Sequence, residues 1–104
     1  MSEATRKSGR GYIYIEMTIR NPEVFGQYTA LSAPAVQTAG GRYIVLGARP
    51  ECLEGAFNAQ SVVIVEFDTV ERARAFYHSA EYQAVREKRL PAADFKMLLM
   101  SGVA

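Results

Sequence analysis

The chain has 104 residues, a formal net charge of +1, and 49% hydrophobic residues. This length supports one domain with one hydrophobic core, and the near-neutral charge argues against nucleic acid or a membrane surface as a partner. The single cysteine, Cys52, cannot form an intramolecular disulfide, and no apolar run near the start is long enough for a signal peptide or a membrane span, so we expect a cytoplasmic protein. One cysteine and one histidine also predict no structural zinc.

Residues 1–10 contain almost nothing to bury, so we expect a mobile, solubilising leader with Arg6, Lys7 and Arg10 in solvent. The folded domain is then expected to cover residues 11–104. Strict alternation of polar or aromatic residues with Ile and Met predicts a first strand from Gly11 to Ile19.

A first helix is predicted to begin at Asn21, because Asn accepts a backbone N–H at the cap, and Pro22 and Glu23 suit the first turn. Pro34 is expected to kink or restart this helix, and the pair Gly40-Gly41 to end it. Its apolar positions are Val24, Phe25, Tyr28, Leu31 and Ala35.

Two further strands are predicted at residues 42–49 and 61–67. In the first, simple alternation would put Tyr43, Val45 and Gly47 on one face and Ile44, Leu46 and Ala48 on the other. The second is rich in β-branched residues without alternation, so both of its faces need cover.

Asp68 and Glu71 have the spacing of a capping box and predict the start of a second helix. Ser79 is expected to break it and to cap a further short helix, which Pro91 stops. A final strand is predicted at about residues 94–101.

The resulting βαββαβ order predicts an α+β ferredoxin-like sandwich with a four-stranded antiparallel sheet. Helices shield only one face of such a sheet, yet the later strands are apolar on both faces. We therefore expect a homodimer, in which a partner sheet covers the other face.

Charged residues in this framework have both chemical and structural interpretations. Glu66 interrupts an apolar strand. It is therefore either a general base or an acceptor for a ligand hydroxyl, with a raised pKa, or one half of an ion pair with Arg42 or Arg89. Arg42 could bind a substrate carboxylate or meet the carbonyls at the end of the first helix. His78 is the side chain best suited to proton transfer near neutral pH, with a plain surface position as the alternative.

Six tyrosines are many for this length. Tyr28, Tyr77 and Tyr82 are our candidates for a substrate-binding pocket between helices and sheet, with Arg89 beside them and Glu66, Arg42 and His78 as catalytic candidates. The alternative explanation is that these tyrosines pack in the core and that each hydroxyl makes one hydrogen bond. Cys52 follows no reactive motif and is interpreted as a passive thiol.

Four segments of the chain form a recognisable series: Gly40-Gly41-Arg42-Tyr43, Glu54-Gly55, Glu66-Phe67 and the run from Tyr77 to Gln83. In their order and spacing, they resemble the bacterial DUF1330 family, and the resemblance extends from Gly11 to about Val103. The resemblance implies a dimeric α/β barrel of the ferredoxin-like type. Ser61 and Ala80 depart from the family pattern, which often has Arg and Pro at these positions.

Proteins with this fold include small monooxygenases, isomerase-like proteins and stress-responsive dimers, so the fold alone predicts no reaction. Two functions stay open at this point. One is an enzyme without a cofactor, monooxygenase-like or isomerase-like, acting on a small aromatic or carboxylate-bearing metabolite. The other is a dimer that binds such a ligand, or serves in stress, without catalysis.

Overall fold

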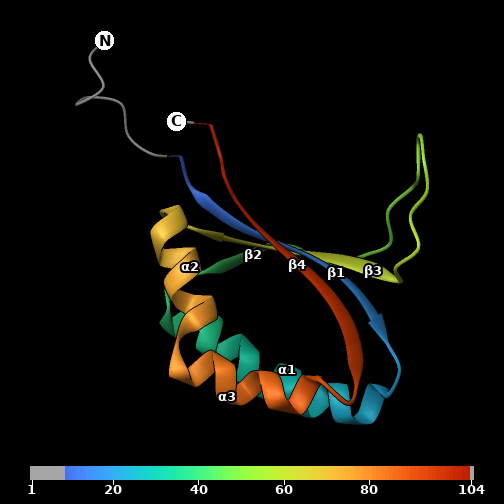
Figure 1. Cartoon of the computed structure of the whole chain (residues 1–104), viewed down its shortest axis with the longest axis horizontal. Helices are drawn as coiled ribbons and strands as arrows, with labels where there is room; N and C mark the ends of the chain where they lie inside the picture. The colour runs from blue at the N-terminus through green and yellow to red at the C-terminus, as the bar shows by residue number, and fades with distance from the viewer. Residues whose placement is uncertain (1–8, 104) are drawn as a thin grey trace.

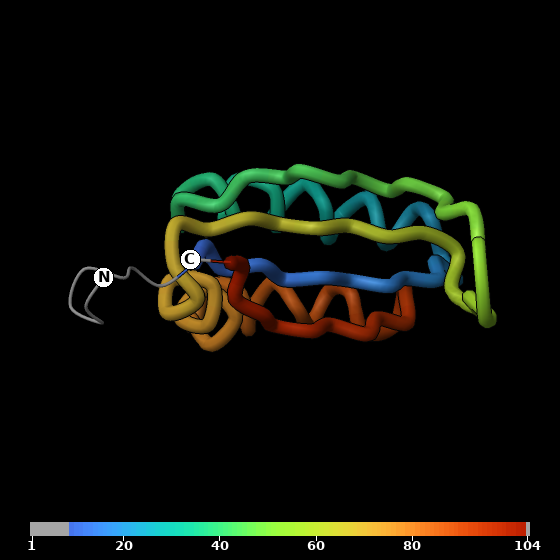
Figure 2. The backbone as a smooth tube through the Cα atoms, turned by 90° about the horizontal axis from the view of Figure 1, so that it is seen from above, coloured from blue at the N-terminus to red at the C-terminus, as the bar shows by residue number. Residues whose placement is uncertain are grey.

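The computed structural model describes residues 9–103, in which four strands form one antiparallel sheet and three helices lie against one of its faces (Figure 1). The strand order β2-β3-β1-β4 puts β2 and β4 at the edges (Figure 2). This confirms the ferredoxin-like α+β fold, with the second helix divided in two. The elements are β1 (Gly11–Ile19), α1 (Pro22–Thr38), β2 (Arg42–Ala48), β3 (Ser61–Phe67), α2 (Val70–His78), α3 (Ala80–Arg89) and β4 (Ala93–Ser101).

The central strand β1 has the predicted alternation. Ile13, Ile15 and Met17 are buried beneath the helices, whereas Tyr12 and Tyr14 point to the opposite face and are half-buried. We call the face beneath the helices the covered face and the opposite one the open face.

The edge strand β2 differs from the prediction, because two irregularities in its pairing with β3 interrupt the alternation. Tyr43 pairs with Val65 on the covered face, but Val45 pairs with Ile64 on the open face and Leu46 with Val63 on the covered face. The predicted grouping of Tyr43 with Val45 is therefore wrong. Gly47 lies beside the second irregularity with φ of +70°, a conformation that favours glycine.

The first helix begins as predicted, with the Asn21 side chain accepting the Val24 N–H at 3.2 Å. It continues through Pro34 to Thr38, so of the predicted kink or restart, the restart does not occur. Its end is confirmed, since Gly40 has φ of +84° and Gly41 donates to the Val36 carbonyl at 2.9 Å. Leu31 is 47% exposed, and the buried face is formed instead by Tyr28, Ser32 and Val36.

The second helix is capped by Thr69, which accepts the Arg72 N–H at 3.1 Å, and not by Asp68 as predicted. The predicted break at Ser79 is confirmed. The Ser79 hydroxyl donates to the Phe76 carbonyl at 2.7 Å and accepts the Tyr82 N–H at 3.1 Å, so it ends α2 and starts α3.

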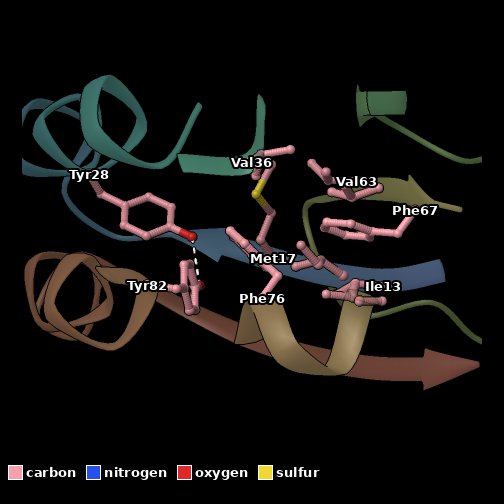
Figure 3. Packing of buried hydrophobic residues seen from close by; sticks show 11 residues of the cluster. Ile13, Met17, Tyr28, Val36, Val63, Phe67, Phe76 and Tyr82 are labelled. Carbon is pink, nitrogen blue, oxygen red and sulfur yellow. Dashed lines mark hydrogen bonds between the residues drawn. The ribbon is translucent and has the colours of Figure 1, made fainter. Parts of the chain in front are cut away.

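The core lies between the helices and the covered face (Figure 3). Phe67 and Tyr82 are the largest side chains that are fully buried, and Phe76 packs between them with ring centroids 5.5 and 4.9 Å away. Tyr82 comes from α3, so this aromatic stack joins both short helices to the end of β3.

The open face has an apolar row and a polar row across all four strands. Val45, Ile64, Tyr14 and Leu98 are cross-strand neighbours in the apolar row. The next row consists of Arg42, Glu66, Tyr12 and Met100. Leu98 is 47% exposed and Met100 44%, so part of this face is apolar surface without cover in the single chain.

The predicted leader lies, for residues 1–8, outside the described part of the chain. Arg10 is exposed as expected, but its guanidinium also pairs with Asp68 at 3.1 Å and its carbonyl accepts the Gly102 N–H at 2.7 Å. Within residues 9–103, no helix combines the length and the apolar character needed to cross a bilayer.

Candidate functional site

A cavity of about 130 Å³ lies between the helices and the covered face of the sheet. It forms because α1 packs chiefly on α3 and makes few contacts with the strands. Its lining is mostly apolar, because the inward residues of the strands and the first helix contribute hydrocarbon and aromatic groups. Among them are Ile13, Ile15, Met17, Phe25, Val36, Leu46, Val63, Val65, Phe76, Phe95 and Met97.

Two phenols form the principal polar contact of this cavity. Tyr28 from α1 and Tyr82 from α3 both line it, and their hydroxyl oxygens are 2.8 Å apart (Figure 3). Both side chains are buried, at 6% and 1% exposure. Tyr43, Ser32 and Thr29 add further hydroxyl groups to the lining.

The guanidinium of Arg89 lies directly behind this tyrosine pair. Its Nη1 donates to the Tyr82 hydroxyl at 3.0 Å and lies 3.4 Å from the Met97 sulfur. Its central carbon lies 4.2 Å from the centroid of the Phe95 ring and 5.9 Å from that of Tyr28, so it also makes cation–π contacts. Arg89 is 4% exposed.

Burial raises the pKa of both cavity tyrosines. For Tyr28, desolvation is the main cause and the neighbouring Tyr82 adds to it. For Tyr82, desolvation also dominates, but the hydrogen bond shared with Tyr28 and the positive charge of Arg89 partly offset this rise in pKa. Both groups therefore stay protonated at neutral pH, so they offer hydrogen bonds to a ligand and do not act as bases.

The other predicted pair, Glu66 and Arg42, is on the open face. The Arg42 Nε donates to the Glu66 carboxylate at 2.7 Å, and the Tyr12 hydroxyl donates to the other carboxylate oxygen at 2.9 Å. Arg42 also contacts Asp68 at 3.3 Å. The hydrogen bonds from Tyr12 and Arg42 lower the pKa of Glu66, whereas a general base needs a raised one.

Tyr77 and His78 flank a separate cleft between α2 and β4, together with Arg74 and Leu99. His78 is exposed, and its ring meets the Tyr77 ring edge-on at 5.1 Å between centroids. The Tyr77 ring also packs on Tyr82, with centroids 5.7 Å apart, but Tyr77 does not line the cavity.

The structure therefore divides the predicted site residues among three places. Tyr28 and Tyr82 line the cavity and Arg89 contacts them, as expected of a pocket between helices and sheet. The expectation that Glu66, Arg42 and Tyr77 surround the same pocket is wrong, because the first two lie on the opposite face of the sheet and the third lines another cleft. The Glu66–Arg42 ion pair is formed, and a pair of Glu66 with Arg89 is not.

Sequence reasoning missed Ser32 as a lining residue. Its signal was present, because residues 28, 32 and 36 are spaced by four and share one helical face. In the described part of the chain, no group of three or more His, Cys, Asp or Glu side chains is arranged to hold a metal ion. Cys52 is exposed in the β2–β3 loop, with its sulfur 3.2 Å from the Gly55 carbonyl oxygen.

Comparison with protein families gives one assignment. The profile of the family described as a domain of unknown function, DUF1330, matches residues 10–103. This agrees with the resemblance found from residue patterns. No curated protein matches the chain at a significant level.

Solved structures share the fold at low sequence identity. A protein of unknown function from Rhodopseudomonas palustris is 18% identical, with a TM-score of 0.75 over 97% of this chain and 88% of its own. SnoaB, a cofactor-independent oxygenase from Streptomyces nogalater, is 13% identical, with a TM-score of 0.69 over 92% of this chain and 95% of its own. A dimeric ferredoxin-like protein of unknown function from Thermobifida fusca is 21% identical, with a TM-score of 0.57 over 98% of this chain and all of its own.

Proposed function

The chain belongs to the DUF1330 family, and within this family we propose that it is a homodimer whose cavity beneath the helices binds a small aromatic metabolite. The observation that carries the ligand proposal is an apolar cavity of about 130 Å³ with a buried pair of phenols on its wall. Ligand pockets combine an apolar lining with a few placed polar groups in this way.

The size of the cavity limits the ligand. An apolar cavity of about 150 Å³ binds benzene, and the volume of about 130 Å³ here is close to that value, so the cavity suits a ligand with one aromatic ring. The Tyr28 hydroxyl would donate to one oxygen on that ring or its substituent, while the Tyr82 hydroxyl, 2.8 Å away, holds Tyr28 in place. We assign ligand contact to these two residues.

The homodimer is supported by the open face. Its apolar row spans every strand of the sheet, and a second copy of the same sheet would cover it. The β2–β3 loop projects beyond this face, away from the helices, and carries Leu53 at 84% exposure (Figure 1). The Thermobifida fusca protein of similar fold is described as dimeric.

Ligand-induced stabilisation tests the pocket. A set of one-ring aromatic compounds is expected to raise the apparent melting temperature, because a ligand that binds the native state at about 100 times its Kd adds about 2.7 kcal/mol of stability. Ser32→Leu should fill the cavity and remove this shift. Ala33→Leu adds a side chain of similar size on the exposed side of the same helix and should retain it. A full shift in Ser32→Leu would exclude this cavity as the site.

A second candidate function is catalysis without a cofactor in the same pocket. It is favoured by the likeness in fold to SnoaB and by the Arg89–Tyr82–Tyr28 array, which can hold a substrate oxygen and supply a proton to it. The lining of the cavity contains no carboxylate and no imidazole in the described part of the chain, so binding has the stronger geometric support.

Turnover assays on the compounds that bind distinguish the two candidates. An enzyme would convert at least one of them in air without added cofactor, and Tyr28→Phe would slow conversion more than it weakens binding. If compounds bind but mass spectrometry detects no product from any of them, the non-catalytic function is the one supported.

A further inference from the structure

The strongest feature beyond the pocket itself is the buried charge of Arg89. No carboxylate of residues 9–103 lies within 4.0 Å of its guanidinium, and its Nε has no hydrogen-bond partner. Removing a cation from water without an opposite charge beside it is costly, so such groups are normally paired. Residues 9–103 therefore supply no opposite charge to compensate this cation.

The contacts of Arg89 connect it to the cavity. Tyr82, Met97 and Phe95 all touch the guanidinium and all line the cavity. The charge consequently lies one side chain away from the bound ligand. The positive charge would attract an anion in the cavity, because the protein interior screens charges poorly.

Hydrogen bonds through the tyrosine pair connect the positive charge of Arg89 to the ligand and so favour an anion. Arg89 donates to the Tyr82 oxygen, which leaves the Tyr82 proton free to point to the Tyr28 oxygen 2.8 Å away. The Tyr28 proton is then free to donate to a ligand oxygen. All three groups donate in the direction of the ligand, an arrangement that favours a negatively charged acceptor.

We propose that the ligand is an aromatic anion, with a carboxylate or phenolate oxygen facing Tyr28, and that Arg89 is the positioning residue that supplies the opposite charge through Tyr82. This inference rests on the proposed function of the cavity and adds the charge of the ligand to it. The raised pKa values of Tyr28 and Tyr82 agree, because the phenols themselves do not ionise at neutral pH to neutralise Arg89.

Benzoate and benzamide test the charge, since they have nearly the same shape and differ in charge. By titration calorimetry at neutral pH, we expect benzoate to bind at least about tenfold more tightly than benzamide. Arg89→Met should reduce this ratio to about twofold or less while benzamide binding changes little. Lys88→Met removes the same charge from an exposed position on the same helix and should preserve the ratio.

A measurement on the unaltered protein distinguishes carboxylate from phenolate and needs no variant to fold. The absorbance of 4-nitrophenol reports its own ionisation, and binding beside the Arg89–Tyr82–Tyr28 array should lower its pKa by about one unit. A lowered pKa with weak benzoate binding would identify a phenolate site. Tight benzoate binding without the pKa change would identify a carboxylate site.

The outcomes separate this inference from the pocket. Equal binding of benzoate and benzamide, with no change in the pKa of nitrophenol, would overturn the anionic ligand and leave the pocket standing. Failure of every aromatic probe to bind would overturn both proposals. A preference for benzoate that survives in Arg89→Met would remove Arg89 from its assigned role.

Discussion

Arg42 and Glu66 on the open face of the sheet form an ion pair, whereas no carboxylate among residues 9–103 pairs with the guanidinium of Arg89 beneath the helices. Arg42 and Arg10 meet Glu66 and Asp68 at 2.7 and 3.1 Å, with both guanidinium groups about half exposed. Arg89 is buried and contacts phenol, thioether and aromatic groups in the described part of the chain.

This difference helps to separate structural charges from functional ones. A half-exposed ion pair costs little to form and adds little stability, because water screens it. A buried cation is costly to retain, so its presence beside a cavity is more informative than the presence of a visible ion pair. In the sequence, Glu66 stands out because it interrupts an apolar strand, yet in the structure Arg89 lies closer to the cavity.

The largest effect is expected from placing a charge on the open face. Leu98→Glu would bury a carboxylate against the partner sheet, at a cost of several kcal/mol, and should dissociate the homodimer at micromolar concentration in light scattering. Leu31→Glu is the matched control, because Leu31 has the same 47% exposure but lies on α1. A monomeric unaltered protein, or a dimer that withstands Leu98→Glu, would contradict the proposed interface.

An intermediate effect is expected on the covered face from Tyr82→Phe. This change leaves Arg89 Nη1 without its phenol acceptor and should lower the free energy of unfolding in urea by about 1–3 kcal/mol. Tyr12→Phe removes a phenol from the open face, where Glu66 retains its pair with Arg42, so we expect a smaller loss. Equal losses in the two variants would mean that the two faces do not differ as described.

The smallest effect concerns the pH dependence of stability. Hydrogen bonds from Tyr12 and Arg42 lower the pKa of Glu66 in the folded chain, so the unfolded chain takes up this proton more readily. The resulting stability is present above the ordinary carboxyl pKa and is lost as the pH falls through the lowered pKa.

Glu66→Gln should therefore weaken the dependence of stability on pH at the acid end, as measured by urea unfolding at a series of pH values. Glu51→Gln, in the exposed β2–β3 loop, should leave this dependence unchanged. Ligand-induced stabilisation should persist in Glu66→Gln, because Glu66 lies across the sheet from the cavity. Loss of ligand binding in that variant would instead restore Glu66 as a site residue.

Much of the fold could be predicted because its signals are local. Asn21 and Ser79 cap helices through hydrogen bonds to residues three positions away, and the alternation in β1 follows from the geometry of a strand. The cap of α2 was predicted one residue too early, because Asp68 and Thr69 both accept hydrogen bonds well. Asp68 instead contacts Arg10 and Arg42, which are distant in sequence.

The candidate site was predicted in part. The sequence predicts Tyr28 and Tyr82 as inward-facing aromatics, and the structure joins them by a hydrogen bond across 54 positions of sequence. Glu66 was expected beside them, but an alternating strand sends neighbouring residues to opposite faces. Val65 faces the cavity, so Glu66 cannot.

The sequence by itself determined the order of helices and strands, the ends of most of them and the membership of the DUF1330 family, because periodicity, caps and family motifs act over short stretches of chain. Only the tertiary structure decided the irregular pairing of β2, the separation of Glu66 and Arg42 from the cavity tyrosines, and the distance of Arg89 from every carboxylate in the described part of the chain. These features depend on which distant segments meet, and burial and charge pairing are set by those long-range contacts.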